Sequence, residues 1–141
     1  ENLQKTGAFK IRGAYNKIMK LDDEAKKKGL IASSAGNHAQ GVAYAAKKLG
    51  VKATICMPAH TPLIKVDATK AHGADVVLYG EAYDEAYEKA VELQKSEGYT
   101  FVHPFDDEDI ITFLYSNSNL EEDHPYFFTH WNEQQFYMDN E

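Results

Sequence analysis

Residues 30–41 of the chain read LIASSAGNHAQG, and this stretch decides the fold. Leu30 to Ala32 is short and apolar, which predicts a buried strand. The small residues 33–36 favour a turn, and from Asn37 onward apolar residues recur at helical spacing. A strand, a turn and a helix in this order leave backbone N–H groups at the helix start, where an anion or a polar ring could lie. Gly36 would let a ligand approach the backbone closely.

The same unit of a strand followed by a helix repeats along the chain. Patterning predicts strands at residues 30–34, 51–57, 74–79 and 100–102, and helices at 11–21, 37–49, 61–72 and 83–95. Thr61 is the expected N-cap of the third helix, with Pro62 at its first helical position. Residues 22–29 are charged and are predicted to end the first helix and form a loop. The alternation indicates an α/β fold with a parallel sheet of about four strands and helices on both faces.

Length and charge limit the classes of function. A chain of 141 residues can form one domain with a core, and its net charge of −7 argues against nucleic-acid binding and gives no attraction to an anionic membrane. The single cysteine, Cys56, allows no disulfide within the chain and fits a reducing compartment, so we expect a cytoplasmic location. No apolar run reaches the length of a transmembrane helix.

Several polar residues have both a structural and a functional interpretation. Lys10 follows Gly-Ala-Phe and is most simply a solvated lysine at a helix start; the alternative is a lysine that binds an aldehyde cofactor. Ser33, Ser34 and Asn37 are helix-capping residues, or else they form a cradle for a carboxylate with Asn37 as a donor. His38 is expected to pack or cap rather than to catalyse.

Known motifs for other chemistries are absent. His124 and His130 have no accompanying cysteine or second close pair, so no metal site is expected. The sequence contains neither GxGxxG nor a Walker motif, so it offers no dinucleotide or P-loop site. The acidic run at residues 106–109 is most simply a helix start.

Two long segments resemble a known family. ENLQKTGAFKIRGAYNKI at residues 1–18 and IASSAGNHAQGVAYAAKKLGVKATICMP at residues 31–58 resemble the cofactor-attachment segment and the asparagine loop of pyridoxal-phosphate-dependent threonine dehydratases (threonine ammonia-lyases). These enzymes have the tryptophan-synthase-β-like fold type. PLIKVDATKAHGADVVLYG and FVHPFDDEDII continue the resemblance in register, so that it covers about residues 1–111.

The resemblance implies a cofactor, a reaction and a set of site residues. Lys10 would hold pyridoxal phosphate covalently and remove the Cα proton of the substrate, and Phe9 would lie near the cofactor. Asn37 would hydrogen-bond the hydroxyl oxygen of the cofactor ring. The implied reaction is β-elimination from threonine or serine, which yields a 2-oxo acid and ammonia. Related serine racemases carry an acid/base serine at the position of Ala35. The substrate carboxylate would bind to the loop made of Ser34, Ala35, Gly36, Asn37 and His38.

The resemblance also predicts how the chain is divided. Residues 1–29 would be the cofactor-lysine segment and a helix that belongs to the large domain in the family, and residues 30–111 the small α/β domain. Residues 112–141 contain eight aromatic residues and no Gly, Ala, Val, Ile, Lys or Arg, which indicates a tail of different origin.

Two functions from different classes follow, beside a third interpretation in which the chain is a complete small enzyme that uses Lys10. The glycine-rich phosphate loop of the family and the residue that pairs with the pyridine nitrogen are absent, so we expect a dehydratase fragment that is inactive alone. The alternative is a non-catalytic folding module that forms a homo-oligomer through its leading helix and aromatic tail.

Overall fold

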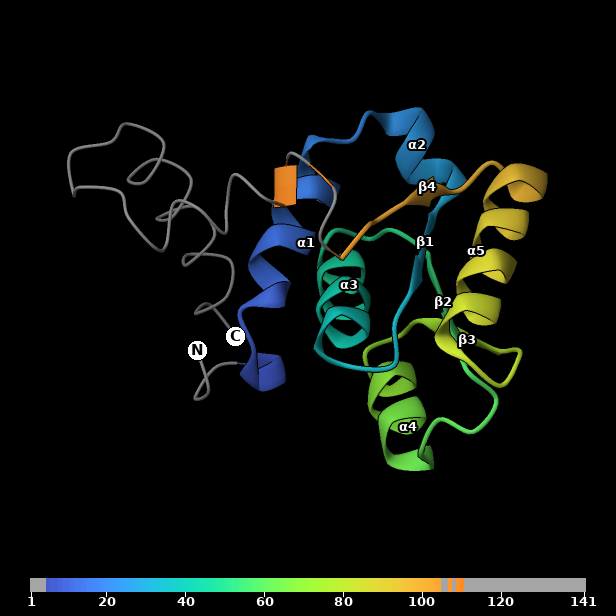
Figure 1. Cartoon of the computed structure of the whole chain (residues 1–141). Helices are drawn as coiled ribbons and strands as arrows, with labels where there is room; N and C mark the ends of the chain where they lie inside the picture. The colour runs from blue at the N-terminus through green and yellow to red at the C-terminus, as the bar shows by residue number, and fades with distance from the viewer. Residues whose placement is uncertain (1–4, 105–106, 108, 111–141) are drawn as a thin grey trace.

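A four-stranded parallel sheet forms the centre of the molecule. The computed structural model describes residues 5–104, 107, 109 and 110. The strands β1 (Leu30–Ser33), β2 (Ala53–Met57), β3 (Asp75–Leu78) and β4 (Thr100–Phe101) lie in the order β3-β2-β1-β4, and every paired strand is parallel to its neighbour (Figure 1). The predicted α/β class and sheet are therefore confirmed, while the strand order is new information.

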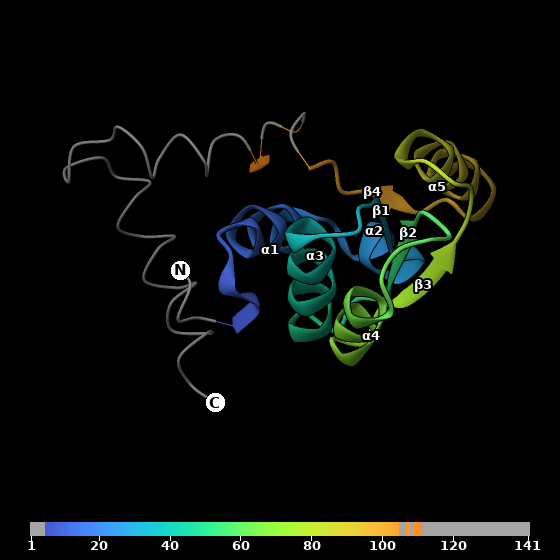
Figure 2. The ribbon, with the colours of Figure 1, turned by 60° about the horizontal axis from the view of Figure 1, so that its bottom comes forward.

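Helices cover both faces of this sheet. On one face lie α3 (Asn37–Lys48) and α4 (Leu63–Ala71), and on the other lies α5 (Tyr83–Glu97) (Figure 2). The first long helix, α1 (Lys10–Lys20), packs on α3, and short segments η1 (Lys5–Gly7) and α2 (Asp23–Lys28) flank it in the sequence. Side chains on β1 alternate between the two faces, so Leu30 and Ala32 join the α3 side of the core and Ile31 joins the α5 side.

The apolar side of α1 is covered within this chain. Ile11, Ala14 and Ile18 recur at helical spacing and are buried, and Ala14 and Ile18 share one core with the helix α3 behind them. The helix α3 therefore buries the apolar side of α1 within the chain itself. The assignment of residues 1–29 to a separate large domain stays a prediction.

Two local predictions were wrong. Residues 22–29 contain a separate helix, α2, because the Asp22 side chain accepts a hydrogen bond from Ala25 N at 2.8 Å and so caps it. Thr61 does not cap α4: Pro62 occupies the N-cap position, and no side chain caps that helix. The predicted tail at residues 112–141, with His124 and His130, lies outside the described residues.

Candidate functional site

The site predicted from sequence lies where β1 ends and α3 begins. Ser33 ends the strand, and Asn37 is the exposed first residue of the helix. Gly36 occupies the N-cap position of α3, and no side chain accepts a capping hydrogen bond from this helix. The prediction that Ser33, Ser34 and Asn37 simply cap the helix was therefore wrong. The Ser34 hydroxyl instead accepts a hydrogen bond from Gly36 N at 3.2 Å. The first N–H groups of α3 have no partner inside the helix, and they are therefore suited to an anion.

The turn before α3 leaves space for a ligand. A Cβ atom added at Gly36 would have no described neighbour within 4 Å, and Ser34 and Ala35 are half-buried. The backbone at this edge of the sheet is accordingly open, as expected for parallel sheets, which bind ligands beyond the carboxyl ends of their strands.

Lys10 is the first residue of α1, and its amine is held by a backbone carbonyl. Its Nζ donates a hydrogen bond to Pro104 O at 2.9 Å and lies 5.6 Å from the centre of the Phe9 ring, which is 45% exposed. Partial burial lowers the pKa of the Lys10 amine below its ordinary value. A larger share of the amine is then neutral and able to act as a nucleophile or a base.

A close backbone contact brings the start of α1 beside the first turns of α3. A Cβ atom at Gly41, which lies one turn after Asn37, would come within 2.9 Å of Ile11 N and 3.1 Å of the carbonyl carbon of Lys10. Only a residue without a side chain fits at this distance. The structure thus brings the predicted lysine and the predicted loop to the same end of two neighbouring helices, the lower end in Figure 1.

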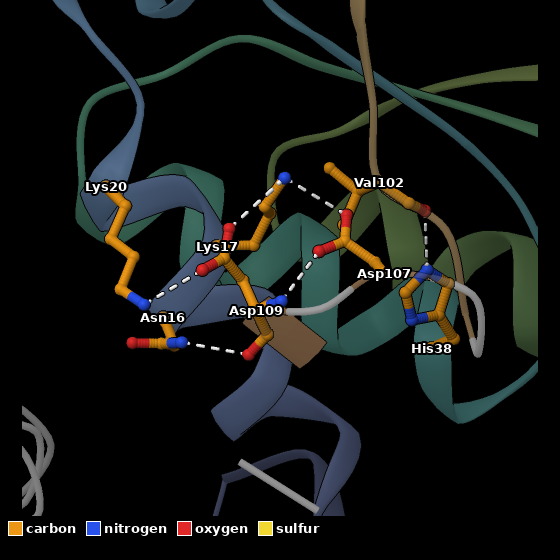
Figure 3. Close-up of polar contacts among 7 residues, drawn as sticks. All are labelled: Asn16, Lys17, Lys20, His38, Val102, Asp107 and Asp109. Atoms are coloured by element: carbon orange, nitrogen blue, oxygen red, sulfur yellow. Dashed lines mark hydrogen bonds and ion pairs between the residues drawn. The ribbon is translucent and has the colours of Figure 1, made fainter. Parts of the chain in front are cut away.

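His38 is a buried packing residue, as predicted from sequence. Its Nε2 lies 2.9 Å from Val102 O, and because a carbonyl only accepts hydrogen bonds, Nε2 carries the proton (Figure 3). Burial lowers the pKa of His38 to about 4, and the nearby positive charge of Lys10 acts in the same direction. The imidazole is therefore neutral near pH 7.

Ion pairs and a hydrogen bond join the chain after β4 to the second half of α1 (Figure 3). We call this group the clamp; it consists of Asn16, Lys17, Lys20, Asp107 and Asp109. Lys17 Nζ lies 3.2 Å from an Asp107 oxygen and 3.3 Å from an Asp109 oxygen, and Lys20 Nζ lies 2.8 Å from the other Asp109 oxygen. Asn16 Nδ2 also donates to Asp109 O at 2.9 Å. The hydrogen bond from Lys20 holds the pKa of Asp109 below its usual range. Asp107 and Asp109, two residues of the predicted acidic helix start, thus form one half of this clamp.

Sequence reasoning missed three contributors to the site. These are the glycine at position 41, the carbonyl groups of Val102 and Pro104, and the clamp carboxylates. Gly41 had a weak signal, because a glycine inside a helix is unfavourable relative to alanine and so calls for a structural reason. The contacts of the Val102 and Pro104 carbonyl groups had no signal in the sequence, because every residue type carries a carbonyl group.

Two other features are absent from the described part of the chain. There, no group of three or more His, Cys, Asp and Glu side chains could hold a metal ion. Among the same residues, no helix combines the length and apolar character needed to cross a membrane.

Comparisons with known proteins give a consistent result. The family described as pyridoxal-phosphate dependent enzyme matches residues 1–121. L-threonine ammonia-lyase from Thermotoga maritima is 58% identical over 111 residues, which cover 79% of this chain and 28% of that protein. The processed form of threonine deaminase isoform 2 from Solanum lycopersicum superposes with a TM-score of 0.77 at 50% identity, covering 79% of this chain and 31% of that one. Maize serine racemase also gives a TM-score of 0.77, at 38% identity, over 80% of this chain and 34% of its own. The chain thus spans about a third of these relatives or less.

Proposed function

Because the chain belongs to the pyridoxal-phosphate-dependent enzyme family, we propose that it is the part of a threonine ammonia-lyase that carries the cofactor lysine and the substrate-carboxylate loop. The cofactor is that of the family, pyridoxal phosphate, as the sequence predicts. The relatives support the substrate, since an L-threonine ammonia-lyase and a threonine deaminase match most of this chain. The substrate we propose is a small hydroxy amino acid, threonine or serine.

The observation that carries this proposal is the Lys10 amine, with its lowered pKa, at the open end of the sheet. The other residues of the predicted site also fit the cofactor. An amine suits the aldehyde, the exposed Asn37 amide can donate to a ring hydroxyl oxygen, and the open turn at Gly36 leaves room for a ligand. When bound, pyridoxal phosphate supplies an electron sink that stabilises negative charge at the substrate Cα.

Each residue then has a defined task. The Lys10 Nζ would hold the cofactor covalently, and the same amine would serve as the base for the proton at the substrate Cα. Ser34, with the backbone N–H groups of Ala35, Gly36, Asn37 and His38, binds and orients the substrate carboxylate. His38 moves no proton, because its Nε2 proton is committed to Val102 O and its pKa is low. Ala35 has no hydroxyl to serve as a second acid or base, which favours a dehydratase over a racemase.

We further propose that these residues alone do not turn over substrate. The phosphate of the cofactor would need the glycine-rich loop that the family provides elsewhere, and that loop is absent from this sequence. Association through the leading helix is not favoured, because α3 covers the apolar side of α1. A cytoplasmic location remains a prediction.

Threonine turnover tests this function. We expect no measurable 2-oxo acid from the chain alone, and formation of 2-oxo acid after mixing with the remainder of the Thermotoga maritima enzyme, from which the matching 111 residues have been removed. Lys10→Ala should abolish the restored activity, whereas Lys65→Ala, at an exposed position on α4, should leave it unchanged. Turnover by the chain alone at the rate of an intact dehydratase, or restored activity that survives Lys10→Ala, would contradict the proposal.

A further inference from the structure

We propose that Gly41 is a positioning residue that sets where Lys10 stands relative to the first turn of α3. The inference rests on the proposed function of Lys10, and it concerns a residue with no chemistry of its own. Gly41 would act through the backbone of the α1 start, which its missing side chain allows to lie directly against α3.

The contact is backbone against backbone. A Cβ atom at position 41 would lie 2.9 Å from Ile11 N, 3.1 Å from Ile11 Cα and 3.1 Å from the Lys10 carbonyl carbon. Unlike the end of a flexible side chain, these atoms cannot move without moving the helix. An added methyl group therefore has to displace the residue that carries the amine.

The other end of α1 cannot follow that displacement easily. Asn16, Lys17 and Lys20 are bonded to the segment after β4 through Asp107 and Asp109. A push at Gly41 should consequently pivot α1 about its clamped half, and the Lys10 end should move most.

The pKa of the Lys10 amine should change when α1 pivots. Its hydrogen bond to Pro104 O spans 2.9 Å, and its environment is partly buried. Moving the helix start outward lengthens this bond and exposes the amine to water. Removal of the desolvation raises the pKa of Lys10 toward its ordinary value.

The test measures the Lys10 amine in the full chain without any cofactor. Competitive acylation across a pH series, followed by peptide mass spectrometry, gives the titration midpoint of each lysine. We expect Gly41→Ala to raise the Lys10 midpoint by about half a pH unit, which is about a threefold loss of neutral amine at lower pH. The midpoint of Lys65, on α4, should not change.

Gly13→Ala is the matched control. It makes the same substitution in α1 itself, but its new methyl group meets the Ile110 side chain, at 3.0 Å from Cγ2, rather than the backbone of Lys10. This variant should keep the wild-type Lys10 midpoint. Circular dichroism and thermal melting establish that both variants are folded, with concentrated sucrose added if the melting temperature falls.

Three results would overturn the proposal: a folded Gly41→Ala protein with the wild-type Lys10 midpoint, an equal shift in Gly13→Ala, or a Gly41→Ala protein that does not fold even in sucrose. In the last case the start of α1 could not shift to admit the added methyl group, and Gly41 would be required for folding rather than for the position of Lys10. A failure of wild-type Lys10 to bind pyridoxal phosphate would instead remove the proposed function and leave this titration result standing.

Discussion

Replacing Ile55 by Ala is expected to destabilise the folded chain by about 3 kcal/mol. Ile55 is 0% exposed and lies at the middle of β2, opposite Ala32 of β1 and Val76 of β3. The substitution removes buried methyl and methylene groups and leaves a cavity that surrounding strands cannot fill. A domain of this size has about 5–15 kcal/mol of stability in total, so urea denaturation should show a large fall in the midpoint.

Ile64→Ala makes the same chemical change at a surface position. Ile64 is 79% exposed in the first turn of α4, so its removal should alter the free energy of unfolding by less than about 0.5 kcal/mol. Equal losses in the two variants would contradict the placement of β2 at the centre of the sheet.

Acidification should weaken the fold through His38. In the unfolded chain this histidine takes up a proton near pH 6.5, whereas burial lowers its pKa to about 4 in the folded chain. The unfolded state therefore binds more protons between these two values, and stability falls as the pH drops through this range. For a difference of about 2.5 units, the full loss is about 3 kcal/mol.

The His38→Gln variant isolates this contribution. Glutamine is neutral and keeps an N–H donor for Val102 O, so urea unfolding free energies should differ much less between about pH 6.5 and about pH 4 than in the wild type. His60→Gln, at an exposed position, should retain the wild-type dependence on pH. If His38→Gln retained the full dependence as well, His38 would not be the buried, neutral group that the structure describes.

Local patterns were sufficient to predict the class of fold. Short apolar runs and helical spacing each depend on neighbouring residues, so the four strands and the helices on both faces followed directly from them. The errors were also local. Asp22 is a residue type that caps helices, but it lies inside a charged run, and its cap of α2 was not predicted. Thr61 is also a residue type that caps helices, but its side chain does not cap α4.

The geometry of the site needed the structure. Lys10 is far in sequence from Pro104, and Asn16 is similarly far from Asp109, yet both pairs are hydrogen-bonded. Such contacts depend on the strand order, which places β4 beside β1 and brings the following segment back along α1. No periodicity in one sequence specifies that order. The resemblance to a family pointed to candidate residues. The structure added the close contact of Gly41 with the start of α1 and the ion pairs that Lys17 and Lys20 make further along that helix.

Mapping of a reduced pyridoxal phosphate adduct tests the central claim most directly. The chain is mixed with the cofactor and treated with borohydride, which makes the bond between amine and aldehyde permanent, and the modified peptide is identified by mass spectrometry. We predict selective modification of Lys10, which disappears in Lys10→Ala and persists in Lys65→Ala. Modification spread evenly over the surface lysines, or unchanged by Lys10→Ala, would show that Lys10 is not the cofactor lysine.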